Sequence, residues 1–183
     1  ESGYSFLLMD YIEGENLDSF IVRLGRPLSE ERTREMLWYM LDILRYLHTS
    51  SQPILPLDLK TSQFLVDKHG RPSLMDFGVA RQMSRGSRVL PLSFGCGTQA
   101  YSAPEQYVPK ETVVDQRADI YAIGATAYRM LTRHHPPNHG PIPWERCEGR
   151  ISPKLLAALK RATEMYPGDR FHSIQEMMEQ IYR

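Results

Sequence analysis

The sequence predicts a mainly helical α+β fold, with a small β-hairpin region and one strand near the start of the chain. Apolar residues recur at helical spacing over residues 36–47, and residues 119–131 are apolar enough for a second long helix. Between them, residues 53–77 are short apolar runs separated by turn residues. The expected order is therefore one strand, two helices, a hairpin region and then mostly helices.

The first two elements are indicated by the places where apolar runs stop. Residues 5–11 (SFLLMDY) are typical of a buried strand that ends at the polar, glycine-containing residues 13–16. Residues 17–24 can form a short helix, which Gly25 and Pro27 would end. This part of the chain therefore predicts a strand followed closely by a helix.

A long amphipathic helix is predicted next, from Ser29 to about Thr49. The Ser29 hydroxyl suits the N-cap, where it can accept a hydrogen bond from an otherwise unpaired backbone N–H. Glu30 and Glu31 then lie in the first turn, where negative charge interacts favourably with the helix dipole. One face of this helix is apolar, so we expect it to cover a core.

A β-hairpin is predicted after this helix. Residues 64–66 and 73–75 read as its strands, and residues 67–70 (DKHG) contain the residues that favour a tight turn. Residues 78–103, by contrast, are rich in Gly, Ser and Arg without periodicity, which predicts a long mobile loop. Loops of this length in a compact domain are usually functional.

The last part of the chain predicts helices with one irregular segment. Residues 134–149 contain four prolines and three histidines and are expected to be irregular. Ser152 and Pro153 are typical of the N-cap and first position of a helix, which we expect to run to about Met165. Residues 173–176 (SIQE) match a capping box that opens the final helix.

Composition narrows the class of function. The 183 residues carry 22 basic and 22 acidic side chains, so no overall field favours nucleic acid or an anionic membrane. No apolar stretch approaches the ~20 residues that cross a bilayer, and the first residues lack the pattern of a signal peptide. Cys96 and Cys147 are expected to be free thiols, which predicts a cytoplasmic protein.

Three short motifs carry candidate chemistry. Asp58 lies two residues before Lys60, Asp76 opens an Asp-Phe-Gly triplet, and residues 103–105 read Ala-Pro-Glu. Two acids, a lysine and a glycine pivot are the groups that a site needs to handle a metal-bound phosphate and a hydroxyl nucleophile. Each motif alone is weak, because an acid near a lysine is more often a surface ion pair. Their order is what gives them weight.

In this order the motifs resemble the eukaryotic-type protein kinase family, Ser/Thr-like, where His-Arg-Asp-Leu-Lys-x-x-Asn precedes Asp-Phe-Gly and Ala-Pro-Glu. The resemblance runs nearly end to end and implies the helical C-terminal lobe of a kinase. It implies a last N-lobe strand and hinge over residues 1–16 and the larger lobe over residues 17–183, with an activation segment at 76–105. The glycine-rich loop and strand lysine would precede residue 1, so we expect residues 1–183 alone to be inactive or very weak.

The resemblance also implies roles for the polar residues. Asp58 would be the catalytic base, Lys60 a fixed positive charge beside the phosphoryl group, and Thr98 a hydroxyl that bridges the two and indicates Ser or Thr substrates. Asp76 would hold the metal ion. Gln63 stands where the family has Asn as the second metal ligand, and its longer side chain predicts weakened Mg²⁺ binding that the larger Mn²⁺ tolerates better.

The resemblance implies ATP as the nucleotide, with Mg²⁺ or Mn²⁺, and a protein substrate or regulatory protein as partner. Met9 falls at the gatekeeper position, Asp10 and Ile12 at the hinge, and Leu65 under the adenine ring. Without a covering lobe, Met9, Ile12, Leu65 and Leu17 would form an open apolar cleft, which predicts self-association or a partner.

Two further pairs of residues bear on activity and stability. Pro56 and Leu57 replace His-Arg, so a phosphorylated loop residue finds no arginine there, and Asp119 is expected to lose one partner. Glu105 and Arg170, in contrast, match the family's buried ion pair, which supports the fold and is silent about catalysis.

Three readings therefore remain open. The first is a Ser/Thr kinase domain fragment that transfers the ATP γ-phosphate to a protein hydroxyl when an N-lobe completes it. The second is a pseudokinase, a fold kept as a regulatory or scaffolding module, which Pro56, Leu57 and Gln63 favour. The third is an unrelated helical domain. Asp58, Lys60, Asp76 and Thr98 together favour the enzyme.

Overall fold

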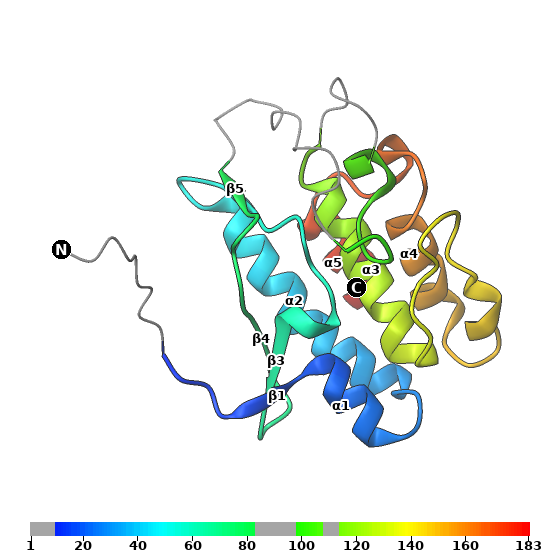
Figure 1. Cartoon of the computed structure of the whole chain (residues 1–183). Helices are drawn as coiled ribbons and strands as arrows, with labels where there is room; N and C mark the ends of the chain where they lie inside the picture. The colour runs from blue at the N-terminus through cyan, green and yellow to red at the C-terminus, as the bar shows by residue number, and fades with distance from the viewer. Residues whose placement is uncertain (1–9, 83–97, 108–113) are drawn as a thin grey trace.

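The computed structural model describes residues 10–82, 98–107 and 114–183, and it shows a mainly helical fold, as predicted (Figure 1). The helices are α1 (Leu17–Leu24), α2 (Glu30–Thr49), α3 (Arg117–Thr132), α4 (Pro153–Ala162) and α5 (Ile174–Tyr182). The strands are β1 (Gly14–Asn16), β2 (Ile54–Leu55), β3 (Phe64–Asp67), β4 (Pro72–Leu74) and β5 (Arg81–Gln82). Four 3-10 turns are η1 (Thr61–Gln63), η2 (Pro104–Tyr107), η3 (Trp144–Cys147) and η4 (Pro167–Asp169).

The first two helices form where local signals predict them. Gly25 ends α1 in the left-handed region at φ 70°, a conformation that glycine adopts without steric cost. Ser29 caps α2, because its hydroxyl accepts the N–H of Arg32, and the helix runs to Thr49. Its apolar face is buried, and His48 lies on that same face in the last turn.

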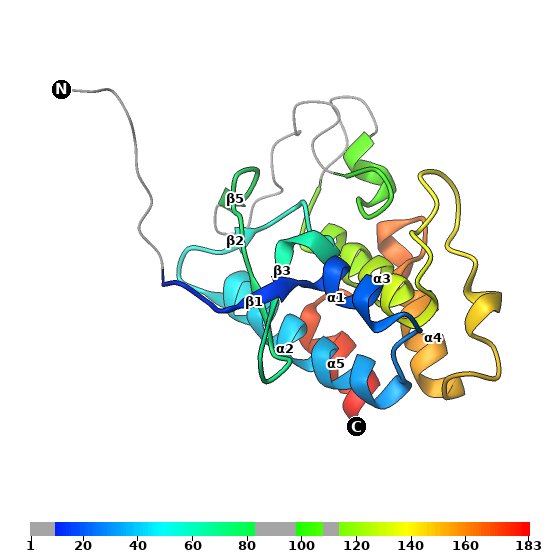
Figure 2. The same cartoon turned by 60° about the horizontal axis from the view of Figure 1, so that its bottom comes forward.

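Helix α3 is the centre of the core. It lies between α2 and α4 (Figure 1), and all its residues from Ala118 to Thr132 are buried. Gly124 permits the close approach of α4, since a Cβ there would lie 2.4 Å from Cγ2 of Thr163. Helix α5 packs against both α2 and α4, and Figure 2 shows α2 and α5 side by side. Because α3 is buried on all sides, packing of its whole surface, and not of one apolar face, holds it in place.

Two small antiparallel sheets complete the fold. One has the strand order β1-β3-β4 and packs against α2, mainly through β4. Its β3–β4 pair is the predicted hairpin, with Val66 opposite Pro72. The other sheet pairs β2 with β5, so that Ile54 lies opposite Gln82. This second pairing was not predicted, because β5 falls in the stretch that was expected to be loop from residue 78.

Several boundaries differ from the predictions. Most of the predicted strand at residues 5–11 lies outside the described residues, and residues 10–13 show no strand. Residues 83–97 of the predicted mobile loop also lie outside them. Helix α4 ends at Ala162, before Met165, since Thr163 at the C-cap has φ −107° and ψ 20°, outside the helical region. The Thr163 hydroxyl donates to the Leu159 carbonyl and accepts the indole N–H of Trp144.

No helix in the described ranges is long and apolar enough to cross a membrane.

Candidate active site

The segment from Leu55 to Lys60 buries its leucines and leaves its charged side chains partly exposed. Leu55, Leu57 and Leu59 are all almost completely buried in the core. Asp58 and Lys60, each directly after one of these leucines, retain 18% and 23% side-chain exposure. Because the leucines fill the core side of the segment, the two charged groups lie together on its solvent side.

Asp58, Lys60 and Thr98 form a closed set of contacts. Lys60 Nζ lies 3.0 Å from Asp58 Oδ2 and donates to the Thr98 hydroxyl oxygen at 2.7 Å. The backbone N–H of Thr98 donates to the other oxygen, Asp58 Oδ1, at 2.9 Å. The structure thus brings these three predicted residues together from two segments of the chain. A carboxylate with two fixed donors has a defined orientation, and its remaining lone pairs can accept a further proton.

Asp76 lies beside this set and is joined to it by Gln63. The Gln63 side-chain nitrogen lies 3.5 Å from Asp58 Oδ2 and 3.4 Å from Asp76 Oδ2, so the two acids converge on one place. Asp76 adopts a left-handed conformation at φ 64°, and its Oδ1 accepts the N–H of Gly78 at 2.8 Å. The backbone carbonyl of Gln63 accepts the N–H of Met75 and so holds the two segments side by side.

The donor set around Gln63 fits a hard divalent cation. Carboxylate and amide oxygens are the protein ligands that Mg²⁺ and Mn²⁺ prefer, with the remaining positions taken by water and phosphate oxygens. No cluster of three or more His, Cys, Asp or Glu side chains that could hold a metal occurs among the described residues. A metal here would therefore depend on Asp76, an oxygen of Gln63 and nucleotide phosphates together.

Leu57, just before Asp58, has a strained backbone that neighbouring side chains hold. Its φ of 62° lies in the left-handed region, which costs a residue with a Cβ roughly 1–3 kcal/mol. The N–H of Leu57 donates to Asp119 Oδ1 at 2.9 Å, and its carbonyl accepts Gln106 Nε2 at 2.8 Å. A hydrogen bond to a charged group contributes roughly 1.5–3 kcal/mol and a neutral one roughly 0.5–1.5 kcal/mol. Together the two bonds contribute roughly 2–4.5 kcal/mol, at or above the middle of the strain range, whereas the neutral bond alone contributes less than that middle value.

Asp119 keeps a hydrogen bond on each carboxylate oxygen, although Pro56 was expected to deprive it of one partner. Its second oxygen, Oδ2, lies 2.9 Å from His48 Nε2 at the end of α2. Both side chains are nearly inaccessible to solvent. Buried carboxylates need such partners, so His48 satisfies the oxygen that the loop backbone leaves free.

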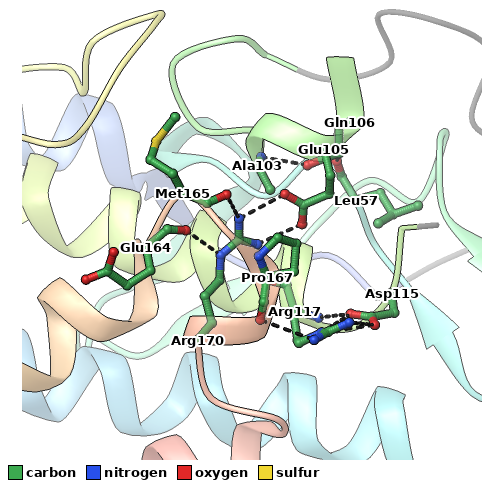
Figure 3. A network of polar contacts seen from close by, with 10 residues as sticks. All are labelled: Leu57, Ala103, Glu105, Gln106, Asp115, Arg117, Glu164, Met165, Pro167 and Arg170. Carbon is green, nitrogen blue, oxygen red and sulfur yellow. Dashed lines mark hydrogen bonds and ion pairs between the residues drawn. The ribbon is translucent and has the colours of Figure 1, made fainter. Parts of the chain in front are cut away.

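The predicted ion pair between Glu105 and Arg170 is confirmed. The guanidinium contacts both carboxylate oxygens, at 2.7 Å and 2.8 Å, and both residues are buried (Figure 3). The remaining donors of Arg170 bind the backbone carbonyls of Arg117, Glu164 and Met165. Every N–H of the guanidinium therefore has an acceptor, which is the condition for burying this charge.

A second network of hydrogen bonds supports the loop that contains Asp58 and Lys60. Thr61, which follows Lys60, donates to Asp18 Oδ1 at 3.0 Å and shares a hydrogen bond with the Tyr101 hydroxyl. Arg129 donates to the same Asp18 oxygen at 3.0 Å. Burial raises the pKa of Asp18, but the hydrogen bond and charge of Arg129 outweigh it, so this pKa lies below its ordinary value. The ionised carboxylate links α1, the loop and α3.

Met9, Asp10, Ile12 and Leu65 were predicted to contact the nucleotide. Met9 lies outside the described residues, and Asp10 and Ile12 are exposed on the extended segment that leads into β1. Within the described part of the chain, no hydrogen bond or ion pair joins either of them to Asp58 or Asp76. Leu65 lies half-buried on β3, opposite Asn16 of β1.

The predicted open cleft needs one correction. Leu17 is completely buried, because its position at the start of α1 packs it into the core, so it cannot contribute to an apolar surface. Ile12 and Phe77, in contrast, retain 37% and 47% of their exposure. Self-association through this surface stays a prediction, with Ile12 and Leu65 as the predicted residues that remain within the described part of the chain.

Two residues of the site were missed by the sequence reasoning. His48 follows the buried positions Leu37, Leu41 and Leu44 at helical spacing, so a polar residue in that stripe was a signal that a buried partner exists. Gln106 gave no such signal. Its partner Leu57 lies 49 residues earlier in the chain, and its other partner is the backbone N–H of Ala103, which no side-chain pattern marks.

The chain is similar to known proteins over nearly all of its length. The family described as the protein kinase domain matches residues 1–179. "Serine/threonine-protein kinase PknA" of Nostoc sp. is 31% identical over 189 residues, covering 96% of this chain and 32% of that protein. "Serine/threonine-protein kinase PknB" of Mycolicibacterium smegmatis is 27% identical, covering 97% and 30%. "Probable serine/threonine-protein kinase SCO3848" of Streptomyces coelicolor is 30% identical, covering 96% and 28%. The chain thus spans about a third of the length of these curated relatives.

Proposed function

Because this chain belongs to the protein kinase family, we propose that it acts in a Ser/Thr kinase which transfers the γ-phosphate of ATP to protein hydroxyls. Residues 17–183 would form the larger lobe, with the activation segment at 76–105, and residues 1–16 the last strand of the smaller lobe and the hinge. The observation that carries the proposal is the closed set of Asp58, Lys60 and Thr98.

The geometry supports a direct transfer. The substrate hydroxyl oxygen would form a bond to the γ-phosphorus while the bond from that phosphorus to the ADP oxygen breaks. Asp58 would accept the hydroxyl proton, since its orientation is fixed by Thr98 and Lys60. Lys60 would offset negative charge that develops on the phosphoryl oxygens. The Thr98 hydroxyl lies 2.7 Å from Lys60, at the position where the family match implies a residue that favours Ser or Thr substrates.

Asp76 and Gln63 are the residues that would hold a divalent metal, which when bound neutralises charge on the nucleotide phosphates. Gln63 would have to turn its amide, because its nitrogen faces both acids at present. Leu65, Asp10, Ile12 and Met9 would line the nucleotide base. These roles follow from the family match.

The proposal is tested by nucleotide binding and phosphate transfer. Calorimetry on the full-length protein, with Mg²⁺ and with Mn²⁺, is expected to show metal-dependent ATP binding. Labelled γ-phosphate is then expected on serine- and threonine-containing peptides and not on matched tyrosine peptides. Absence of ATP binding with both metals would contradict the proposal.

Shortening Gln63 is expected to improve the use of magnesium. In Gln63→Asn, the amide oxygen can reach the metal without a folded-back side chain, which relieves roughly 0.5–1.5 kcal/mol of distortion. The transfer rate with Mg²⁺ should therefore rise about 2- to 12-fold relative to the rate with Mn²⁺. Initial rates over a series of metal concentrations check this. Gln52→Asn, in an exposed turn, is the matched control, and an unchanged metal preference in Gln63→Asn would refute the assignment.

A second candidate function is a pseudokinase that acts through protein contacts. It is favoured by the Gln63 amide nitrogen, which donates to both acids and so takes the place where a metal would bind. The same calorimetry separates the two candidates. Full-length protein that folds, binds no ATP and transfers no phosphate would favour the regulatory module.

A further inference from the structure

Gln106 is a buried amide that joins two segments of the site. It lies on η2, directly after Glu105, and only 3% of its surface is exposed. Its Nε2 donates to the carbonyl of Leu57 at 2.8 Å, and its Oε1 accepts the N–H of Ala103 at 2.8 Å. Figure 3 shows it between these two backbone groups, next to the ion pair that anchors Glu105. One side chain thus bridges the loop of Asp58 and the end of the segment that contains Thr98.

The Leu57 carbonyl matters because the next residue is Asp58. The peptide groups on both sides of the Leu57 Cα are held by side chains, the N–H by Asp119 and the carbonyl by Gln106. These two groups fix both backbone dihedrals of a residue whose φ of 62° is unfavourable. Removing either tie lets Leu57 relax toward negative φ, which would redirect the Asp58 side chain.

We propose that Gln106 is a positioning residue for Asp58. By clamping the Leu57 carbonyl, it keeps the Asp58 carboxylate where the Thr98 N–H can donate to it. The inference rests on the proposed kinase function and deepens it. The clamp carries no charge and needs no phosphorylated residue. The uncharged Leu57 side chain cannot pair with a phosphate, whereas the Leu57 backbone carbonyl is held by the Gln106 amide, which is always present. The anchor of the clamp is η2, which Arg170 fixes through Glu105.

Two substitutions separate the two hydrogen bonds of the amide. Gln106→Glu keeps an oxygen for the Ala103 N–H but places a carboxylate oxygen against the Leu57 carbonyl, so the clamp is lost and repulsion is added. Gln106→Met keeps the shape of the side chain and removes both hydrogen bonds. If the buried carboxylate prevents folding, the methionine variant still gives the measurement.

The readouts are kinetic and spectroscopic, on the full-length protein well below its melting temperature. In Gln106→Met, kcat should fall about 10- to 100-fold, as for a base misplaced by about 1 Å, while KM for ATP stays unchanged. Amide hydrogen exchange should accelerate at Leu57, and at Thr98, whose N–H reports the position of Asp58 Oδ1. The Gly78 amide, which donates to Asp76, should keep its exchange rate.

Gln116 provides a matched control. Its Nε2 donates to the carbonyl of His172, a bond of the same type away from Asp58. Gln116→Met should leave kcat and the exchange of Leu57 and Thr98 unchanged. A purely structural role for Gln106 predicts instead a lower melting temperature with normal kcat and normal exchange at both amides.

The outcomes distinguish this inference from the proposed function. If the protein without substitutions transfers no phosphate, the kinase function fails. Amide hydrogen exchange at Leu57 and Thr98 in Gln106→Met then still decides whether Gln106 positions Asp58. If the protein without substitutions is active, and Gln106→Met changes neither kcat nor the hydrogen exchange of those two amides, the positioning role is overturned while the kinase function stands.

Discussion

Phosphate transfer in Asp58→Asn is expected to fall by about 10²- to 10⁴-fold, the usual contribution of a positioned general base. The amide that replaces the carboxylate cannot accept the hydroxyl proton. ATP affinity should change little, because the candidate metal and nucleotide residues, Asp76 and Leu65, remain. The measurement is kcat together with ATP affinity by calorimetry on the full-length protein, and the expected pattern is a lost kcat with retained binding.

A control makes this result specific to the site. Asp42 is an exposed acid on α2 that pairs with Arg45 at 2.6 Å, so Asp42→Asn makes the same chemical change on a remote surface. It should keep the full rate. Undiminished transfer in Asp58→Asn would remove the base from the mechanism, and equal losses in both variants would point to a general effect of charge.

Removing one partner of the buried pair, by Glu105→Ala or Arg170→Ala, is expected to lower the free energy of unfolding by ~3–5 kcal/mol. The Arg170 side chain is completely buried, and the loss of Glu105 leaves its charge without a counter-ion. For a domain of this size, the change corresponds to a melting temperature lower by roughly 6–20 °C. Thermal and urea unfolding, followed by circular dichroism, measure it.

The exposed pair of Lys160 and Glu148 is the control for this experiment. Its atoms lie 3.2 Å apart, with 43% and 56% of the two side chains exposed, so water already solvates both charges. Lys160→Ala should cost less than about 1 kcal/mol. Equal effects in the buried and exposed pairs would contradict the claim that burial, and not the presence of an ion pair, makes Glu105 and Arg170 important.

Local signals predicted much of the fold correctly. Helix α2 begins at its Ser29 cap and ends at Thr49, and the β3–β4 hairpin turns where its turn residues lie, because caps and tight turns depend on neighbours in the chain. The error at the end of α4 has the opposite cause. Thr163 at the C-cap accepts the indole N–H of Trp144, a contact between separate elements.

The candidate site also has features that local signals predicted and features that depend on contacts between separate elements. The motifs at Asp58, Lys60 and Asp76 identified its acids and lysine, since their order along the chain is legible without coordinates. The burial of Leu17 was misjudged, because a residue predicted to lie at a cleft turned out to face the core. Burial depends on which elements pack together, and a single sequence does not state that.

The sequence by itself determined the family, the main helices and the charged groups of the site, because periodicity, capping residues and ordered motifs are local properties of the chain. Only the tertiary structure decided how Asp58 is held. The left-handed turn at Leu57 is unfavourable in isolation, and it persists because Asp119 and Gln106 reach it from distant segments. Such hydrogen bonds form only when the core brings those segments within about 3 Å, so no local pattern records them.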